Sequence, residues 1–429
     1  MNALDPIRRD LVVAVTTELI ELRGRRRQEG LDPSREEEDV AARAAARRFL
    51  DDLAARRLVS GEEIPDSETE NVLVKAALDI VLGFGPLQAL LDDPEITDIH
   101  VRGSRPVWVK RRDGRREQRH PIANSDDELI VLVRNLASRS RNGERRFDAS
   151  TAECNLCLPD GSRLFAVMDV STEPSLVVRK HQFHLSSMEQ LVRAGLMSPD
   201  VSRFLRAAVL ARRNIVVVGG TGSGKTTLLR ALINEVPMHE RIVTIEDAFE
   251  LGIDRFADLH PDHDALQTRG ANVEGRGAID LSALTRMALR MDPDRVIVGE
   301  VRGAEAFPML LAMSQGNNGS MCTLHADSTR SAFSKLAAYV SMADTGLPID
   351  IVNLLIANAV HVVVHVEVRH GVRRLTSVRE VVDADGPRIV SNELFAMVDG
   401  TDARAQFPMT TELASLLAEH GYGQQLVRS

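Results

Sequence analysis

The spacing of hydrophobic positions changes twice along this chain of 429 residues, and each change marks a predicted domain boundary. In residues 5–58, apolar side chains recur every three or four positions among dense charges, which predicts amphipathic helices. A break containing Gly30 and Pro33 separates two such helices, and Ser34 is positioned to cap the second. A polar linker follows. We therefore predict a helical N-terminal extension with its linker over residues 1–66.

The second region, residues 67–184, carries the signals of an antiparallel sheet. Strand-like runs at 96–101 and 107–111 are joined by a short turn, and two further runs flank a Pro-Asp-Gly-Ser turn at 159–162. Such turns favour hairpins, because Gly and Asp tolerate the backbone conformations that tight connections need. Together with an amphipathic helix at 129–138, this pattern predicts a smaller α+β domain.

From residue 185 onward, short apolar runs alternate with helical patterns. Short, mostly apolar runs are predicted as buried parallel strands, at residues 215–218, 242–245, 296–298 and 322–324. A strand pair at 362–368 and 374–382 and a helix at 411–419 complete this part. Alternating strands and helices are typical of a doubly wound α/β domain, which we predict for residues 185–429.

The first of these predicted parallel strands leads into a glycine-rich loop. Gly219, Gly224, Lys225 and Thr226 fit the pattern Gly-x-x-x-x-Gly-Lys-Ser/Thr, and apolar residues at helical spacing follow. In such a loop, backbone N–H groups surround phosphate oxygens at a helix N-terminus, while the lysine reaches the β- and γ-phosphates. The sequence therefore predicts a nucleoside triphosphate site. Its predicted phosphate-binding residues are Gly220, Thr221, Gly222, Ser223, Gly224, Lys225, Thr226 and Thr227.

Polar side chains follow the other predicted parallel strands at their carboxyl ends. These residues are Glu246, Glu250, Glu300 and His325, and we predict that they are catalytic. Ligands bind outside the carboxyl ends of parallel strands, so we expect these groups to converge on the γ-phosphate. Each alone would be interpreted as a solvated strand end or a structural histidine, but their combination favours hydrolysis. Thr226, Glu246 and Glu300 are the predicted Mg²⁺ ligands.

Composition narrows the possible partners. The net charge is −9 and aromatic residues make up 3% of the chain, which argues against a nucleic-acid coat or base stacking. No apolar run reaches the roughly 18 residues of a membrane span, and the N-terminus lacks a signal-peptide pattern. We therefore expect a cytoplasmic protein that reaches a membrane only through partners. Cys154 and Cys157 form a single Cys-x-x-Cys pair, which we interpret as two ordinary thiols.

The motifs together resemble those of a known family. The loop at 219–227, the acidic segment at 244–251, the stretch at 292–303 and the segment at 316–326 look like four boxes in the right order. They are the Walker A, Asp, Walker B and His boxes of the type II/IV secretion ATPase superfamily. Within it, the chain is most similar to the CpaF/TadA-like ATPases of Tad (tight adherence) pilus assembly. This resemblance covers residues 73–382.

The resemblance implies a RecA-like P-loop NTPase domain and a homohexameric ring that hydrolyses ATP with Mg²⁺. It also implies that Arg163 and Arg179, from the smaller domain, reach toward the phosphates when that domain closes on the nucleotide. The expected partners are inner-membrane pilus or secretion platform proteins, with no direct contact to nucleic acid. The expected location is peripheral, at the inner face of the cytoplasmic membrane.

Some positions depart from the pattern of that family, and other functions stay open. Asn317 stands where the family usually has His, Asp292 where it commonly has Arg, and Gln267 where it commonly has Glu. None of these changes removes the phosphate loop or the two main carboxylates. The alternatives are a type IV secretion ATPase, a nucleic-acid translocase on a RecA-like core, and a nucleotide-dependent scaffold with little turnover.

Overall fold

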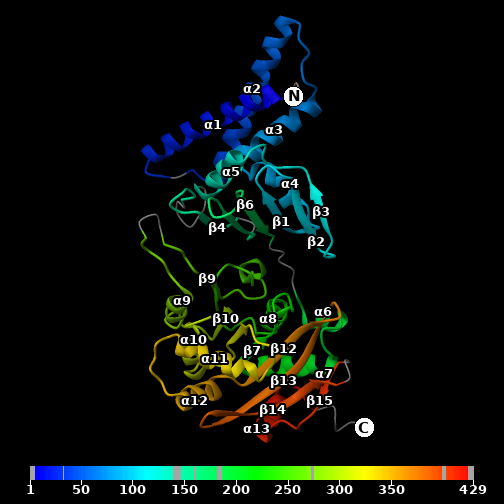
Figure 1. Cartoon of the computed structure of the whole chain (residues 1–429), viewed down its shortest axis with the longest axis vertical. Helices are drawn as coiled ribbons and strands as arrows, with labels where there is room; N and C mark the ends of the chain where they lie inside the picture. Colours follow the sequence, from blue (N-terminus) through cyan, green and yellow to red (C-terminus); the bar gives the residue numbers. More distant parts are fainter. Residues whose placement is uncertain are drawn as a thin grey trace. The chain divides into compact units, whose positions relative to one another are not determined.

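A computed structural model gives the fold of the chain (Figure 1). The structure describes residues 5–31, 33–138, 146–158, 161–180, 186–271, 275–398 and 402–423. The chain divides into two compact units, Met1–His181 and Gln182–Ser429. The predicted boundary between residues 184 and 185 lies outside the described residues.

Three helices of the first unit pack on one another. They are α1 (Asp5–Gln28), α2 (Arg35–Ser60) and α3 (Ser67–Val81). The N-terminus of α2 is a capping box, in which Ser34 and Glu37 exchange hydrogen bonds between side chain and backbone. Leu11 of α1 and Ala77 of α3 are fully buried in the core that the three helices share. The helices of the predicted extension thus pack against the first helix of the region that follows.

The rest of the first unit is built on an antiparallel sheet, as the hairpin signals predict. Its strands are β1 (Ile96–Arg102), β2 (Val107–Arg111), β3 (Arg116–Arg119), β4 (Glu153–Cys157), β5 (Arg163–Val167) and β6 (Ser175–Arg179). They lie in the order β3-β2-β1-β6-β5-β4. The helical segments are η1 (Gly85–Leu87), α4 (Gln88–Asp92) and α5 (Asp126–Ser138). Leu87, Leu91 and Leu129 from these segments share one core with Ile99 and Leu164 of the sheet.

The two cysteines of the Cys-x-x-Cys pair both lie on β4. Cys154 is buried and Cys157 is partly buried. Residues three positions apart on a strand point to opposite faces of the sheet, so β4 does not bring the two thiols together. This geometry favours the interpretation of two ordinary thiols.

The second unit contains a nine-stranded mixed sheet. Its strands are β7 (Ile215–Val218), β8 (Ile242–Glu246), β9 (His263–Gln267), β10 (Arg295–Val301), β11 (Met321–Leu324), β12 (Val362–Arg369), β13 (Val372–Asp385), β14 (Arg388–Met397) and β15 (Ala403–Ala405). The order is β15-β14-β13-β12-β7-β11-β10-β8-β9. Strands β12 to β9 in this order run parallel, and β13 to β15 are antiparallel. The strand β7, which leads into the glycine-rich loop, therefore lies between β12 and β11.

Helices cover both faces of this sheet (Figure 1). They are α6 (Met188–Arg193), α7 (Pro199–Leu210), α8 (Lys225–Ile233), α9 (Leu281–Ala288), α10 (Ala306–Ser314), α11 (Ser331–Ser341), α12 (Ile349–Ala359) and α13 (Thr411–Glu419), with the short η2 (Ile253–Phe256). Alternate residues of β7 enter different cores: Val217 packs with α6, α7, α8 and α13, whereas Val216 packs with α9 to α12. The predicted α/β architecture, with helices on both faces of a largely parallel sheet, is confirmed.

No single helix within the described ranges is long and apolar enough to cross a bilayer. Taken together, α3 and the segment Gly85–Asp92 have the length and apolar composition of a span, by length and composition only. These two segments are bent by 114° relative to each other. Both contribute buried leucines to cores of the first unit, Leu73 from α3 and Leu91 from α4.

Candidate nucleotide-binding site

The glycine-rich loop connects β7 to α8 at the carboxyl end of the parallel strands. Gly222 and Gly224 have φ values of +74° and +99°, which glycine adopts without strain. At Gly219, an added Cβ would lie 2.0 Å from the carbonyl oxygen of Val366, so β12 leaves no room for a side chain there. No side chain caps the N-terminus of α8, whose first residue is Lys225. The backbone N–H groups of its first turn can therefore receive an anion.

The lysine of the loop is buried against neutral acceptors. Lys225 is 7% exposed, and its Nζ donates to the carbonyl oxygens of Gly219 and Gly220, each at 3.0 Å. Burial lowers the pKa of Lys225, because the ammonium loses water and gains no direct ion pair with a described residue. The nearby hydroxyl of Ser223 is buried and has no hydrogen-bond partner among the described residues. These features fit a bound phosphate, which would supply charged acceptors to both groups.

The predicted catalytic residues Glu300 and His325 lie in direct contact with each other. Glu300 Oε1 lies 2.6 Å from His325 Nε2, and His325 Nδ1 lies 3.4 Å from Lys225 Nζ. Because an ammonium can only donate, Nδ1 is the acceptor and Nε2 carries the proton. The ring lies within ion-pair distance of Glu300, although Glu300 Oε1 accepts no hydrogen bond from the described residues. Burial, with the nearby Lys225, lowers the pKa of His325 and keeps the imidazole neutral at pH 7. A continuous polar chain thus joins the phosphate loop to Glu300.

Arg302 continues this series of polar contacts beyond Glu300. Its Nε donates to Glu300 Oε2 at 2.8 Å, and its Nη1 lies 3.6 Å from Asp247 Oδ2. No role of Arg302 was predicted from the sequence. The signal was present, because Arg302 follows Glu300 by two positions at the end of β10, where side chains of equal parity share a face of the strand.

Glu246 is the most deeply buried carboxylate of the site. It is 3% exposed at the end of β8, and its Oε1 accepts the backbone N–H groups of Glu250 and Leu251, each at 2.8 Å. Its Oε2 has no partner among the described residues. Burial raises the pKa of Glu246 to about 7. A Cβ on Gly299 would lie 3.0 Å from Glu246 Cγ, so this side chain packs beside the residue that precedes Glu300.

These features also bear on the predicted Mg²⁺ site. Within the described ranges, no three His, Cys, Asp or Glu side chains cluster as a metal-binding group. Mg²⁺ commonly uses one or two carboxylates together with substrate phosphates and waters, so a protein cage is not required. The unpartnered Glu246 oxygen fits a cation partner. Thr226 and Glu300 would complete the predicted set.

Of the remaining predicted site residues, Glu250 belongs to the second unit, and Arg163 and Arg179 belong to the first. The backbone N–H of Glu250 holds Glu246, as described above, and the role of the Glu250 carboxylate stays a prediction. Arg163 and Arg179 belong to the first unit, where they face each other across the β5–β6 ladder on one face of the sheet. Their predicted contact with the phosphates also stays a prediction.

A pocket of about 200 Å³ borders the loop on the β11 side. Its lining combines the loop with the segment after β11 and with α11, and comprises Gly219, Gly220, His325, Ala326, Asp327, Ser331 and Lys335. The sequence motif predicted the loop residues and His325. Lys335 and Ser331 come from a helix without a motif, so only the tertiary structure brings them to the loop.

Comparisons with known proteins agree with this site. The sequence profile of the family described as "Type II/IV secretion system protein" matches residues 81–395. A Mycobacterium tuberculosis protein, provisionally named as a conjugal transfer protein, is 36% identical over 314 residues, 71% of this chain and 86% of that protein. Type IV secretion system protein VirB11 of Brucella suis is 31% identical over 325 residues, 69% of this chain and 88% of the relative.

A solved structure supports the fold alone. The Legionella pneumophila ATPase DotB aligns with a TM-score of 0.50 at 17% identity, over 69% of this chain and 79% of DotB. The family profile covers most of the chain and includes the loop, both carboxylate strands and the segment of His325. The chain therefore belongs to the type II/IV secretion system protein family.

Proposed function

We propose that this protein is a P-loop ATPase motor of the RecA-like type, which hydrolyses ATP to drive assembly of a Tad or type IV-like pilus, or secretion across the cell envelope. The observation that carries the proposal is the polar chain from Lys225 through His325 to Glu300, at the N-terminus of an uncapped helix. It joins a phosphate-binding loop to a carboxylate that can act on water.

The chain's own residues divide the work of hydrolysis. Lys225 and the backbone N–H groups of the loop hold the β- and γ-phosphates, and the buried cation offsets charge that develops in the transition state. Glu300 orients the attacking water, and the neutral His325, whose Nε2 lies 2.6 Å from that carboxylate, limits its movement. Glu246 accepts a cation or a proton with its open oxygen. Mg²⁺ held by Thr226, Glu246 and Glu300 would supply further positive charge to the phosphates.

The finer assignments follow from the family resemblance. We propose a homohexamer at the inner face of the cytoplasmic membrane, where inner-membrane platform proteins are its partners. Arg163 and Arg179 would add positive charge at the phosphates. The type IV secretion motor is the second candidate, because relatives at 31% and 34% identity carry the names VirB11 and PtlH homolog of type IV secretion systems.

The first experiment is steady-state ATP hydrolysis by the purified full chain beside Glu300→Gln and Lys225→Ala, with oligomer mass recorded on each sample. Glu300→Gln should keep nucleotide binding and lose about 10²- to 10⁴-fold in turnover, because it removes the group that orients water. Lys225→Ala should lose binding as well. Glu419→Gln, at an exposed position of α13, serves as the matched control and should behave as wild type.

Three results would contradict the proposal. Normal hydrolysis by Glu300→Gln would transfer the catalytic role to another carboxylate. Unchanged ATP affinity in Lys225→Ala would remove the phosphate-binding role of the loop. Strong stimulation of hydrolysis by single-stranded DNA would favour the nucleic-acid translocase over a secretion motor.

A further inference from the structure

The hairpin formed by β12 and β13 extends along the phosphate loop. β12 pairs in parallel with β7, where His365 lies opposite Val218, and continues four residues beyond the end of β7. The two turn residues, His370 and Gly371, both have positive φ, at 48° and 79°. This is the geometry of a tight turn between two antiparallel strands. The close approach of the Val366 carbonyl to Gly219 shows that the hairpin and the loop are packed together.

One arginine of this hairpin lies across the loop. Arg373 Nε donates to the carbonyl oxygen of Gly222 at 3.1 Å. Its Cδ lies 3.2 Å from the place where a Cβ on Gly224 would stand, so the side chain also covers the N-terminus of α8. The residue is exposed, and its two terminal amino groups make no hydrogen bond or ion pair with any described residue. An anchored guanidinium therefore presents two open donors next to the predicted phosphate cradle.

We propose that Arg373 is a phosphate ligand of the nucleotide, supplied by the same subunit that provides the loop. This inference rests on the proposed function and adds a binding residue to that site. The planar guanidinium holds two donors in a fork that matches phosphate oxygens, and a bond through Nε fixes its orientation before the ligand arrives. A neutral carbonyl is a weak partner for a cation, so a phosphate beside it would be a stronger one.

The strand order indicates which step Arg373 affects. β12 and β11 lie on opposite sides of β7, so Arg373 reaches the loop from the side away from His325 and Glu300. Those two residues act at the γ-phosphate in the proposed mechanism. Arg373 therefore contributes to the binding of the phosphates that ADP and ATP share, and contributes little to the cleavage step itself.

A second arginine on the same hairpin provides a matched control. Arg373 pairs with Val368 across the hairpin, whereas Arg369 pairs with Val372, so the two arginines point to opposite faces. Arg369 forms an ion pair with Glu367 and contacts Met397 of β14 at 3.5 Å. It has the same charge and a similar position on the chain, but it faces away from the loop.

The experiment measures the affinities of Mg-ADP and Mg-ATP by titration calorimetry on the purified full chain and on Arg373→Ala, Arg373→Lys and Arg369→Ala. Arg373→Ala should weaken both nucleotides by about tenfold, the scale of one charge-assisted contact. Arg373→Lys should recover part of this loss, because the charge remains and the fork is absent. Arg369→Ala should stay within about twofold of wild type in both affinities and in kcat at saturating ATP.

The inference is overturned if Arg373→Ala binds ADP as wild type does, or if Arg369→Ala loses as much affinity as Arg373→Ala. A lower kcat with unchanged ADP affinity also overturns it, because Arg373 would then act on cleavage. Thermal melting without nucleotide checks folding, and the lysine variant preserves the test if the alanine variant is unstable. Wild type that binds no nucleotide would overturn the proposed function, and this inference with it.

Discussion

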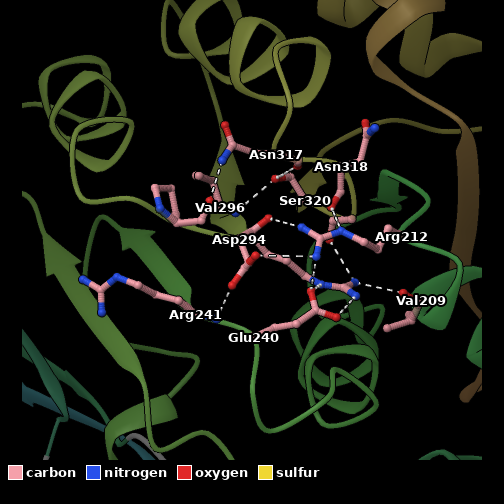
Figure 2. A network of polar contacts seen from close by, with 12 residues as sticks. Val209, Arg212, Glu240, Arg241, Asp294, Val296, Asn317, Asn318 and Ser320 are labelled. Atoms are coloured by element: carbon pink, nitrogen blue, oxygen red, sulfur yellow. Dashed lines mark hydrogen bonds and ion pairs between the residues drawn. The ribbon is translucent and has the colours of Figure 1, made fainter.

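The parallel sheet of the second unit carries buried polar groups at both of its edges, and the two edges differ in how completely those groups are paired. At the edge where the strands begin, Arg295 is fully buried, and its guanidinium donates to both oxygens of Glu240, at 2.8 and 2.9 Å. Its Nη1 also donates to the carbonyl oxygen of Val209 at 2.9 Å. Figure 2 shows that Arg212 approaches Glu240 from another side, with Nη1 and Oε2 3.0 Å apart.

At the same edge, hydrogen bonds between neutral groups connect several loops. Asn214, just before β7, donates to the carbonyl oxygens of Met313 and Ala359, and its Oδ1 accepts the backbone N–H groups of Gly319 and Ser320. Asp294 and Arg241 extend the network toward β8 (Figure 2). A buried polar network with all its members paired adds rigidity.

At the edge where the strands end, pairing is incomplete. Ser223 Oγ and Glu246 Oε2 have no partner among the described residues, and Lys225 has only neutral acceptors and an imidazole within reach. Unsatisfied buried groups cost free energy, so a fold that retains them has a use for them. The comparison teaches that buried polar groups are paired with one another at one edge, and that several of them keep open hydrogen-bonding positions at the other.

The largest expected effect comes from a substitution at the edge where the strands begin, called here the paired edge. Arg295→Met should lower the free energy of unfolding of the second unit by about 3–5 kcal/mol, because it leaves Glu240 buried without its bidentate partner. Arg212→Met is the control: that side chain contacts the same carboxylate but is 36% exposed, and its loss should be smaller. Urea unfolding followed by circular dichroism measures both. If both variants lost the same free energy of unfolding, burial would not explain how much the Arg295–Glu240 pair contributes to stability.

A second, smaller effect concerns pH at the open edge. Glu246 has a pKa of about 7 in the folded protein, against 4.5 for an unperturbed glutamate. If its carboxylate form is required, turnover should fall about tenfold from pH 8 to pH 6, with a midpoint near 7. Steady-state hydrolysis across this range provides the test. A flat profile would exclude ionisation of Glu246 as a controlling step.

The stability of the protein should respond to Glu246 in the opposite direction. The folded state retains the proton of Glu246 between pH 4.5 and 7, whereas the unfolded chain releases it, so this group lowers stability as pH rises through that window. Below pH 4.5 both states are protonated and the contribution vanishes. Glu246→Gln removes the titration, so the variant should become more stable relative to wild type at pH 8 than at pH 5.

The smallest expected effect tests the paired edge again. Asn317, where the family usually has His, lies before β11, at the edge away from the phosphate loop. Its Nδ2 donates to the carbonyl oxygen of Pro293 at 2.5 Å, and its backbone carbonyl oxygen accepts a hydrogen bond from Ser320 Oγ at 2.7 Å. Asn317→His should change turnover by less than about twofold and stability by about 1 kcal/mol. A large rise in turnover would show that position 317 communicates with the catalytic edge.

Much of the fold could be predicted from the sequence. Apolar runs such as residues 215–218 predicted the central parallel strands, because a strand buried on both faces must be apolar at every position. Three strands toward the two sides of the sheet were missed: the edge strand β9 carries partly buried polar residues, and β14 and the edge strand β15 lie beyond the predicted strand pair. Their pairing depends on neighbours distant in the chain, and no local pattern reveals it.

The sequence by itself determined the phosphate loop and the positions of Glu246, Glu300 and His325 at strand ends. The loop depends on the local spacing of its residues, and the three side chains follow strands whose carboxyl ends lie at the same edge of a parallel sheet. Only the tertiary structure decided that His325 touches both Lys225 and Glu300, and that Arg373 crosses the loop. The physical reason is the range of the interactions. Strand and turn preferences act over a few residues, whereas these contacts join residues from 25 to 151 positions apart in the chain, which meet only when the sheet has formed.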